Sequence, residues 1–195
     1  AAPGQPLPSN LAEIQALADV RITDAAGLAN AMPGARALFL WDFFSSALAD
    51  AWPYADSLEW VHVAAAGVDA MLFEDLRRSN VVLTNAHGVF DRPIAEFVLA
   101  SVLAQDKQLH LSKRLQHEAV WQHRELTGTY GSRALVVGTG GIGRATARLL
   151  RAVGLSVRGV GRTAREDDPD FGTVVPSTEL AEHAGWADHL VLAAP

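Results

Sequence analysis

The stretch ALVVGTGGIGRATARLLRAVGLSVRGVGRT, residues 134–163, decides the fold of the second half of this chain. It opens with a short apolar run that is typical of a buried parallel strand. Gly138, Gly140 and Gly143 then form a G-x-G-x-x-G pattern, followed by a helix-type run and a second strand-type run at 156–161. This order of strand, glycine turn, helix and strand predicts a Rossmann dinucleotide-binding unit.

Each glycine of the pattern has a physical role in such a unit. Gly138 permits the tight turn, Gly140 lets a pyrophosphate approach the backbone, and Gly143 lets the helix pack close to the strand. The pyrophosphate then meets free N–H groups and the positive end of the helix dipole. The alternative is a purely structural glycine turn, whereas a Walker loop is excluded because it needs Lys-Ser/Thr after the last glycine. The expected pyrophosphate-binding residues are Gly138, Thr139, Gly140, Gly141, Ile142 and Gly143.

The end of the second strand predicts which cofactor is bound. An NAD site usually carries Asp or Glu about twenty residues beyond the glycine loop, where it bonds the ribose 2′-hydroxyl. Here that place holds Gly161, Arg162 and Thr163. Because a guanidinium fork binds a 2′-phosphate well, we predict NADP(H) in preference to NAD(H). A solvated strand-end arginine is the alternative, and the acidic run 166–168 just beyond is expected to form a solvated loop.

The first half also alternates strand-type and helix-type runs, which predicts an α/β protein of two domains with parallel sheets. We expect one long helix from Pro93 to Leu115 to act as a hinge, with residues 1–100 as one domain and 101–195 as the other. The first domain begins with a loop and the second stops at a strand end, so both are expected to be incomplete. In the first half, strands are expected at 18–23, 37–41, 57–63 and 81–84.

The composition narrows the class of protein. The net charge is −6, which gives no electrostatic support to a nucleic-acid partner. No apolar run reaches membrane-spanning length, and the first residues lack the pattern of a secretory signal. The chain has no cysteine, which excludes disulfides and thiolate sites and is compatible with the cytoplasm. We therefore expect a cytoplasmic protein that binds neither nucleic acid nor membrane.

The histidines do not form a metal or hydrolase pattern. His117 and Glu118 begin an H-E-x-x-H motif, but the second histidine position holds Trp121, so we predict no metal site. His62 is expected to be packed or hydrogen-bonded within a strand. His87 is expected to stabilise a turn, with an approach to the substrate as the alternative.

Three separated stretches, taken together, resemble one known family. They are WVHVAAAGVDAM (60–71), VVLTNAHGVFDRPIAEFVLASVL (81–103) and the glycine loop with its trailing GRT. In order and spacing this chain is similar to the D-isomer-specific 2-hydroxyacid dehydrogenases, most of all to the glyoxylate/hydroxypyruvate reductases. The resemblance implies a flavodoxin-like substrate domain followed by a Rossmann domain, here partial. It also implies a homodimer and the NAD(P)H-dependent reduction of a small 2-keto acid to the 2-hydroxy acid.

The resemblance also implies roles for particular residues. The amides of Ala66, Gly67 and Val68 would bind the substrate carboxylate, which suits a strand end with small residues and exposed N–H groups; a plain strand-to-helix turn is the alternative. The catalytic arginine, glutamate and histidine of the family are expected beyond the chain's last residue, so no catalytic residue is assigned. A non-catalytic dinucleotide-binding corepressor or scaffold on the same fold is the alternative function. The strand end beside the adenine and ribose would be Ala193, Ala194 and Pro195.

Overall fold

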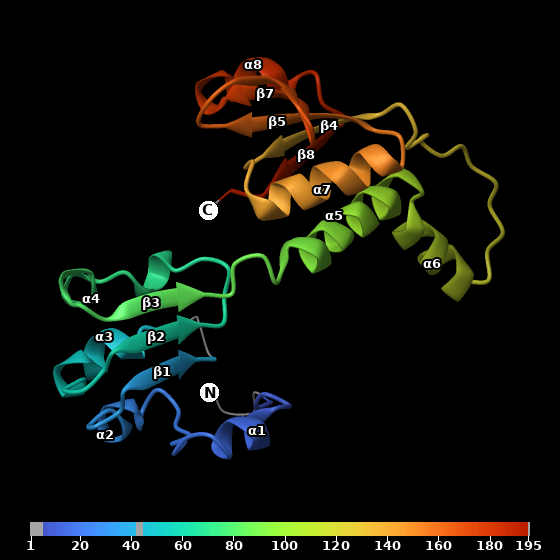
Figure 1. Cartoon of the computed structure of the whole chain (residues 1–195). Coiled ribbons are helices and arrows are strands. Elements are labelled where there is room, and N and C mark those ends of the chain that lie inside the picture. Colours follow the sequence, from blue (N-terminus) through green and yellow to red (C-terminus); the bar gives the residue numbers. More distant parts are fainter. Residues whose placement is uncertain (1–5, 42–44, 195) are drawn as a thin grey trace. The chain divides into compact units, whose positions relative to one another are not determined.

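The computed structural model describes residues 6–41 and 45–194, and it confirms the expected α/β class with parallel sheets (Figure 1). The chain forms two compact units, Ala1–His87 and Gly88–Pro195. The border between these units therefore precedes the long helix that was expected to link the two domains. None of the helices in the described ranges is long and apolar enough to cross a membrane.

The first unit is a parallel sheet of three strands with helices beside it. The strands lie in the order β1 (Ala37–Leu40), β2 (Trp60–Val63) and β3 (Val82–Asn85). Val61 and Val63 are fully buried, because alternate side chains of the central strand point into one core. The helices of this unit are α1 (Leu11–Gln15), α2 (Leu28–Ala31), α3 (Ala47–Ala51), η1 (Trp52–Tyr54), η2 (Asp69–Met71) and α4 (Glu74–Arg78).

The strand expected at residues 18–23 is absent, and this prediction was wrong. The apolar side chain of Ile22 is half exposed, so this alternating segment has no core to face. The segment is held instead by Arg21, whose guanidinium donates to the carbonyl oxygens of Ala31 at 3.1 Å and Pro33 at 2.7 Å.

The second unit is a five-stranded sheet in the order β6-β7-β5-β4-β8. The four strands β7, β5, β4 and β8 are parallel, whereas β6 pairs antiparallel with β7 at one edge. The expectation of parallel strands thus holds except at this edge. The strands are β4 (Arg133–Val137), β5 (Ser156–Gly161), β6 (Arg165–Asp168), β7 (Gly172–Pro176) and β8 (His189–Leu192).

Helices cover both faces of this sheet (Figure 1). Helices α5 (Asp91–Asp106) and α7 (Gly141–Ala152) pack on one face, where Val102, Ala147 and Leu150 share a core with the sheet. On the other face, Leu180 of α8 (Leu180–Ala184) packs on a second core cluster. The short helix η3 (Ser177–Glu179) precedes α8.

The long helix expected from Pro93 to Leu115 is broken. It ends at Asp106, Gln108 takes a left-handed conformation with φ of 47°, and α6 (Leu109–His117) follows. No glycine or proline marks this break in the sequence. The Asp106 carboxylate instead lies against groups from distant segments, accepting from Thr129 Oγ1 at 2.8 Å and lying 3.3 Å from His189 Nε2.

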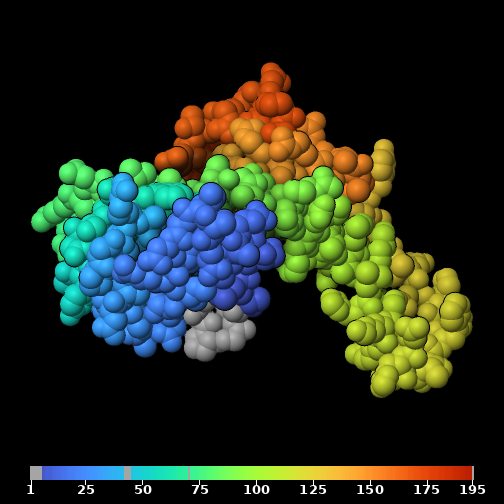
Figure 2. All heavy atoms as spheres, turned by 60° about the horizontal axis from the view of Figure 1, so that its bottom comes forward, coloured from blue at the N-terminus to red at the C-terminus, as the bar shows by residue number. Residues whose placement is uncertain are grey.

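Helix α6 and the segment 118–128, which together are called the arm, extend away from the sheet of this unit (Figures 1 and 2). The arm is tied to the rest of the unit by Lys107, whose ammonium group donates to the Thr127 carbonyl oxygen at 2.7 Å. A hydrogen bond between Arg124 and Ser112 joins the two parts of the arm to each other. Its apolar residues are partly unburied, and the Trp121 side chain is 96% exposed.

Candidate functional site: the glycine loop at the carboxyl edge of the second sheet

The turn between β4 and α7 can be built only with glycine at two positions. Gly138 has φ of 107°, and a Cβ on it would lie 2.6 Å from the Ala193 carbonyl group. A Cβ on Gly143 would overlap the Gly138 carbonyl oxygen. The strand, the turn and the helix are therefore in direct backbone contact, as a Rossmann turn requires.

The loop leaves donors and space for a ligand. A Cβ on Gly140 would meet nothing within 4 Å, so the backbone there is open to an approaching group. The amides of Thr139 and Gly140 donate to no group in the described residues. The first three amides of α7, at Gly141, Ile142 and Gly143, begin the helix and have no carbonyl partner one turn earlier. This cradle fits a pyrophosphate group.

Two glycines at the end of β5 make room for the loop. A Cβ on Gly161 would lie 2.9 Å from Thr139 Oγ1, and one on Gly159 would lie 3.1 Å from Thr139 Cγ2. The Thr139 side chain therefore rests on the strand that leads to Arg162. This contact links the loop to the expected ribose site, and sequence reasoning did not find it because it joins two different elements.

Arg162 and Thr163 follow β5 and are exposed. The Arg162 guanidinium makes no hydrogen bond or ion pair with any described residue, so all its donors are free. The acidic run beyond it is not the solvated loop that was expected. It forms β6, in which Glu166 accepts from Thr173 Oγ1 at 3.1 Å and Asp168 is buried.

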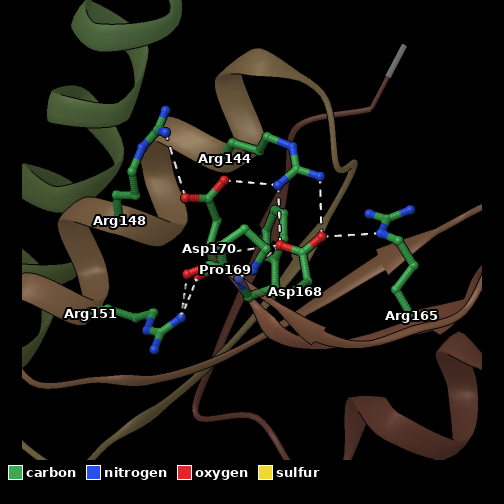
Figure 3. A network of polar contacts seen from close by, with 8 residues as sticks. Arg144, Arg148, Arg151, Arg165, Asp168, Pro169 and Asp170 are labelled. Atoms are coloured by element: carbon green, nitrogen blue, oxygen red, sulfur yellow. Dashed lines mark hydrogen bonds and ion pairs between the residues drawn. The ribbon is translucent and has the colours of Figure 1, made fainter.

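Asp168 joins β6 to the helix behind the glycine loop (Figure 3). Its two carboxylate oxygens accept from Arg144 Nη1 and Nη2, both at 3.1 Å, and from Arg165 Nε at 3.1 Å. Asp170 also pairs with Arg144, at 2.8 Å, and lies 3.5 Å from Arg148. The first arginine of α7 is thus committed to the strand hairpin and is not free to bind a cofactor.

The protonation of Asp168 follows from this network. Burial alone would favour the neutral acid, but hydrogen bonds from Arg144, the Asp170 amide, Arg165 and the Phe171 amide outweigh it. Together they hold the pKa of Asp168 well below its usual range. The carboxylate is therefore ionised at neutral pH and fixes the β6–β7 hairpin, which begins three residues after Arg162.

The end of β8 completes the candidate site. The Ala193 amide donates to the Val137 carbonyl oxygen at 2.7 Å, which places Ala193 and Ala194 against Gly138. The structure therefore brings the glycine loop, Gly161 and the Ala193–Ala194 strand end together at the carboxyl edge of the sheet. Pro195, which was expected to belong to the same group, lies outside the described residues.

One neighbour of the loop was not expected from the sequence. The Asp91 carboxylate, from the first turn of α5, fills the space in front of Gly141, the first residue of α7. Both carboxylate oxygens and Cγ lie within 2.9 Å of the point that a Cβ on Gly141 would occupy. The two residues are far apart in the sequence and share no local signal, so only the packing of the helices reveals the contact.

The second expected site lies in the first unit, after β2. The amides of Ala66, Gly67 and Val68 donate to no other group in the part of the chain that the structure describes. The loop is held by Asn85 Nδ2, which donates to the Ala66 carbonyl oxygen at 2.5 Å. A Cβ on Gly67 would meet only Asp69 Oδ2, at 3.5 Å, so the loop is open at this point.

The remaining candidates have structural places. His62 Nδ1 lies 2.8 Å from Thr84 Oγ1, so this histidine is hydrogen-bonded within the sheet. His87 is exposed and makes no polar contact with a described residue, so the turn-stabilising role expected for it is not seen. Within the described ranges, no group of three or more His, Cys, Asp or Glu residues could hold a metal ion.

A separate hollow of about 590 Å³ lies at the opposite, amino edge of the same sheet. There the Arg158 guanidinium lies 4.1 Å from the centre of the Trp186 ring, and Arg133 forms a two-pronged ion pair with Asp188. Hydrogen bonds from the Arg133 side chain and amide lower the pKa of Asp188 to about 2. These contacts hold together the amino-terminal ends of β4, β5 and β8. The glycine loop at the carboxyl edge therefore remains the candidate site.

Residues 99–195 match the family described as D-isomer specific 2-hydroxyacid dehydrogenase, NAD binding domain. The second half of this chain is an NAD-binding domain of that family. The glycine loop, β5 and the β8 strand end all lie within the matched residues.

Comparisons with individual proteins extend to both halves. An uncharacterized protein in the mprR 3′ region of Streptomyces coelicolor is 32% identical over 145 residues, which are 71% of this chain and 49% of that protein. A crystal structure of a D-isomer specific 2-hydroxyacid dehydrogenase family protein from Aeromonas salmonicida is 27% identical, with a TM-score of 0.81 over 95% of this chain and 60% of that one. The chain thus spans about half the length of this curated relative and 60% of the length of this structural one.

Two further structures share the dehydrogenase fold. One is an NADPH-dependent glyoxylate/hydroxypyruvate reductase from Sinorhizobium meliloti in complex with NADP and sulfate, 23% identical, with a TM-score of 0.71 over 88% of this chain and 52% of that one. The other is a D-lactate dehydrogenase from Aquifex aeolicus complexed with NAD and lactic acid, 21% identical, with a TM-score of 0.71 over 86% and 50%. Members of this fold therefore bind either cofactor.

Proposed function

We propose that this chain binds NADP(H) at the glycine loop and takes part in the reduction of a small 2-keto acid, of the glyoxylate or hydroxypyruvate type, to the 2-hydroxy acid. When bound, the nicotinamide cofactor supplies the hydride for this reaction. The chain's own residues bind and orient the two reactants. The observation that carries the proposal is the glycine cradle, whose amides at Thr139 and Gly140 donate to no described residue, next to a strand end whose arginine pairs with none of them.

The dinucleotide would be held at two points. The amides of the Gly138–Gly143 loop would donate to the pyrophosphate, helped by the positive end of the α7 dipole. Arg162 would bind the 2′-phosphate, because its guanidinium is exposed and pairs with no residue that the structure describes. Thr163 is exposed beside it and offers a hydroxyl. In β6, Asp168 is engaged by arginines and Glu166 by Thr173, which lessens the repulsion of that phosphate by these two carboxylates.

Replacing Arg162 tests the cofactor preference. Arg162→Ala should raise the Kd for NADPH by about 10-fold or more, since a hydrogen bond to a charged group contributes about 1.5–3 kcal/mol. It should leave the Kd for NADH unchanged. Binding is measured by fluorescence titration, with Arg114→Ala as a control that removes an exposed arginine from the arm. Tighter binding of NADH than NADPH by the unaltered chain would refute the preference.

The first unit would bind the substrate carboxylate. The amides of Ala66, Gly67 and Val68, which donate to no described residue, offer a set of donors that suits an anion. Gly67→Ala should fold normally, because its Cβ has room, yet the added methyl group would obstruct the anion. The expected result is a several-fold increase in KM for the keto acid with unchanged NADPH binding. Gly185→Ala, also at an open glycine, serves as the matched control.

Turnover is tested by following NADPH oxidation with glyoxylate, hydroxypyruvate and larger 2-keto acids. The assay is run on the chain and on the complete protein to which it corresponds, because the relatives above are longer than this chain. Consumption of NADPH with a small 2-keto acid supports the proposal. An intact, NADPH-binding complete protein that turns over none of these acids would refute the enzymatic part.

The arm suggests how two copies would associate. Its exposed apolar residues, above all Trp121, leave a surface that a homodimer would cover. Light scattering on Trp121→Ser should then show a shift from dimer toward monomer at the same concentration. A monomeric unaltered chain would contradict this part of the proposal. The exposed apolar residues of the arm are Leu109, Val120, Trp121 and Leu126.

A further inference from the structure

The first residues of two helices in the second unit lie next to each other. Helix α5 starts with Asp91, α7 starts with Gly141, and the Asp91 side chain lies directly against Gly141. The start of each helix carries about half a positive charge, because its first N–H groups lack intrahelical partners. An anion at this place is therefore stabilised, and in this chain the anion is a carboxylate of the protein itself.

The negative charge of Asp91 is not neutralised by a basic side chain. Asp91 forms no ion pair or hydrogen bond through its side chain with any described residue. Arg92, which follows it, pairs with Glu96 at 2.5 Å, and Arg144 of α7 is engaged by Asp168 and Asp170. A second anion that arrives at the glycine loop therefore meets a negative charge that no basic side chain among the described residues neutralises.

We propose that Asp91 is a built-in competitor of the cofactor pyrophosphate, which sets the affinity of the glycine loop for dinucleotides. The inference rests on the proposed function, because it takes the loop as the pyrophosphate site. A pyrophosphate at the start of α7 would use the same positive helix end as the Asp91 carboxylate. Binding must then either displace the carboxylate or place two anions side by side, and both weaken the complex. Asp91 thus favours release of the dinucleotide.

The test compares dissociation constants of the unaltered chain and Asp91→Asn, which keeps the shape of the side chain and removes its charge. We expect the Kd for NADPH to fall by about 3-fold to 10-fold, as a charge at a helix start would give. The gain should be smaller at high salt, because salt screens the repulsion. Adenosine 2′-monophosphate, which has the 2′-phosphate but no pyrophosphate, should bind both proteins equally.

Two controls separate this role from a general effect. Glu182→Gln removes one exposed charge from α8, on the other face of the sheet, and should leave the Kd for NADPH unchanged. Thermal unfolding should show that Asp91→Asn is slightly less stable than the unaltered chain, since α5 loses its first-turn acid. A variant that loses stability yet gains affinity cannot be explained by a purely structural role. Asp91→Ser gives a second neutral side chain should the asparagine variant fail to fold.

Each outcome decides the question. Tighter NADPH binding by the neutral variants, with unchanged adenosine 2′-monophosphate binding, supports the inference. Equal NADPH binding by all variants overturns it and leaves the cofactor proposal intact, whereas weaker binding by Asp91→Asn shows that the carboxylate assists the dinucleotide and also overturns it. If neither the unaltered chain nor any neutral variant binds NADPH or NADH, the proposed function itself fails, and the inference fails with it.

Discussion

Replacing Asp168 by asparagine should destabilise the second unit while leaving its shape nearly unchanged. The Asp168 side chain is 2% exposed, and its Oδ1 accepts from Arg144 and from the amides of Asp170 and Phe171. Its Oδ2 accepts from Arg144 and Arg165. An asparagine can keep its oxygen toward the two amides, but its NH₂ group then faces two guanidinium donors. Two charge-assisted hydrogen bonds are lost.

The size of the effect follows from those two bonds. Each contributes about 1.5 kcal/mol or more, so Asp168→Asn should lower the free energy of unfolding by about 3 kcal/mol. We use the low end of the range because both arginines are about one third exposed, which lets water screen the charges. For a unit of this size the melting temperature should fall by about 10 °C.

Thermal unfolding followed by far-ultraviolet circular dichroism measures this change. Asp167→Asn is the matched control, since it removes the same charge one residue earlier from an exposed side chain. Asp167 has φ of 56°, a conformation that asparagine also accepts well, so this variant should melt close to the unaltered protein. The reasoning is refuted if Asp168→Asn melts within about 2 °C of Asp167→Asn, because that would leave the buried network without a measurable contribution.

Three further outcomes are expected. Gly138→Ala should lower the free energy of unfolding by about 2 kcal/mol or more and abolish NADPH binding. The reason is that Gly138 has a positive φ and that a Cβ there would meet the backbone of Ala193. A variant with an unchanged melting temperature would contradict the turn geometry. Acid titration should show stability lost below about pH 4 and falling further toward pH 2, because Arg133 lowers the pKa of Asp188 to about 2. A group whose pKa is lowered in the folded state stabilises the fold only while it is ionised. An unfolding transition complete above pH 5, the top of the range in which carboxylates of ordinary pKa titrate, would contradict this prediction. Thr146→Val should be neutral or stabilising by about 1 kcal/mol in chemical denaturation, since the buried Thr146 hydroxyl has no hydrogen-bond partner among the described residues. A clear loss of stability would show that the hydroxyl is satisfied.

Much of the second unit was predictable from short stretches of sequence. The strand β5 was expected at 156–161 and lies there, and β4 and α7 flank the glycine turn as the pattern required. These features are local, because a strand, a tight turn and a helix each depend on residues within a few positions of one another. The strands β1, β2 and β3 were found for the same reason, within three residues at their ends.

The failures concern features that depend on distant partners. The run REDD (165–168) has no strand-like alternation, yet it pairs with β7 because Arg144, 24 residues earlier in the chain, binds and neutralises Asp168. The helix break at Gln108 has no glycine or proline, and it occurs beside Asp106, whose partners come from Thr129 and His189. The segment 18–23 alternates like a strand but finds no sheet to join.

The sequence by itself determined a dinucleotide-binding turn and the arginine at the end of its second strand. Both depend on residues that are close together in the sequence, so the conformational freedom of the glycines and the charge of the arginine are enough to predict them. Only the tertiary structure decided what surrounds that turn: Thr139 on Gly161, Ala193 on Gly138, and the Asp91 carboxylate against Gly141. These neighbours come from separate strands and helices, and their distances are set by packing in the core, which no local pattern of residues records.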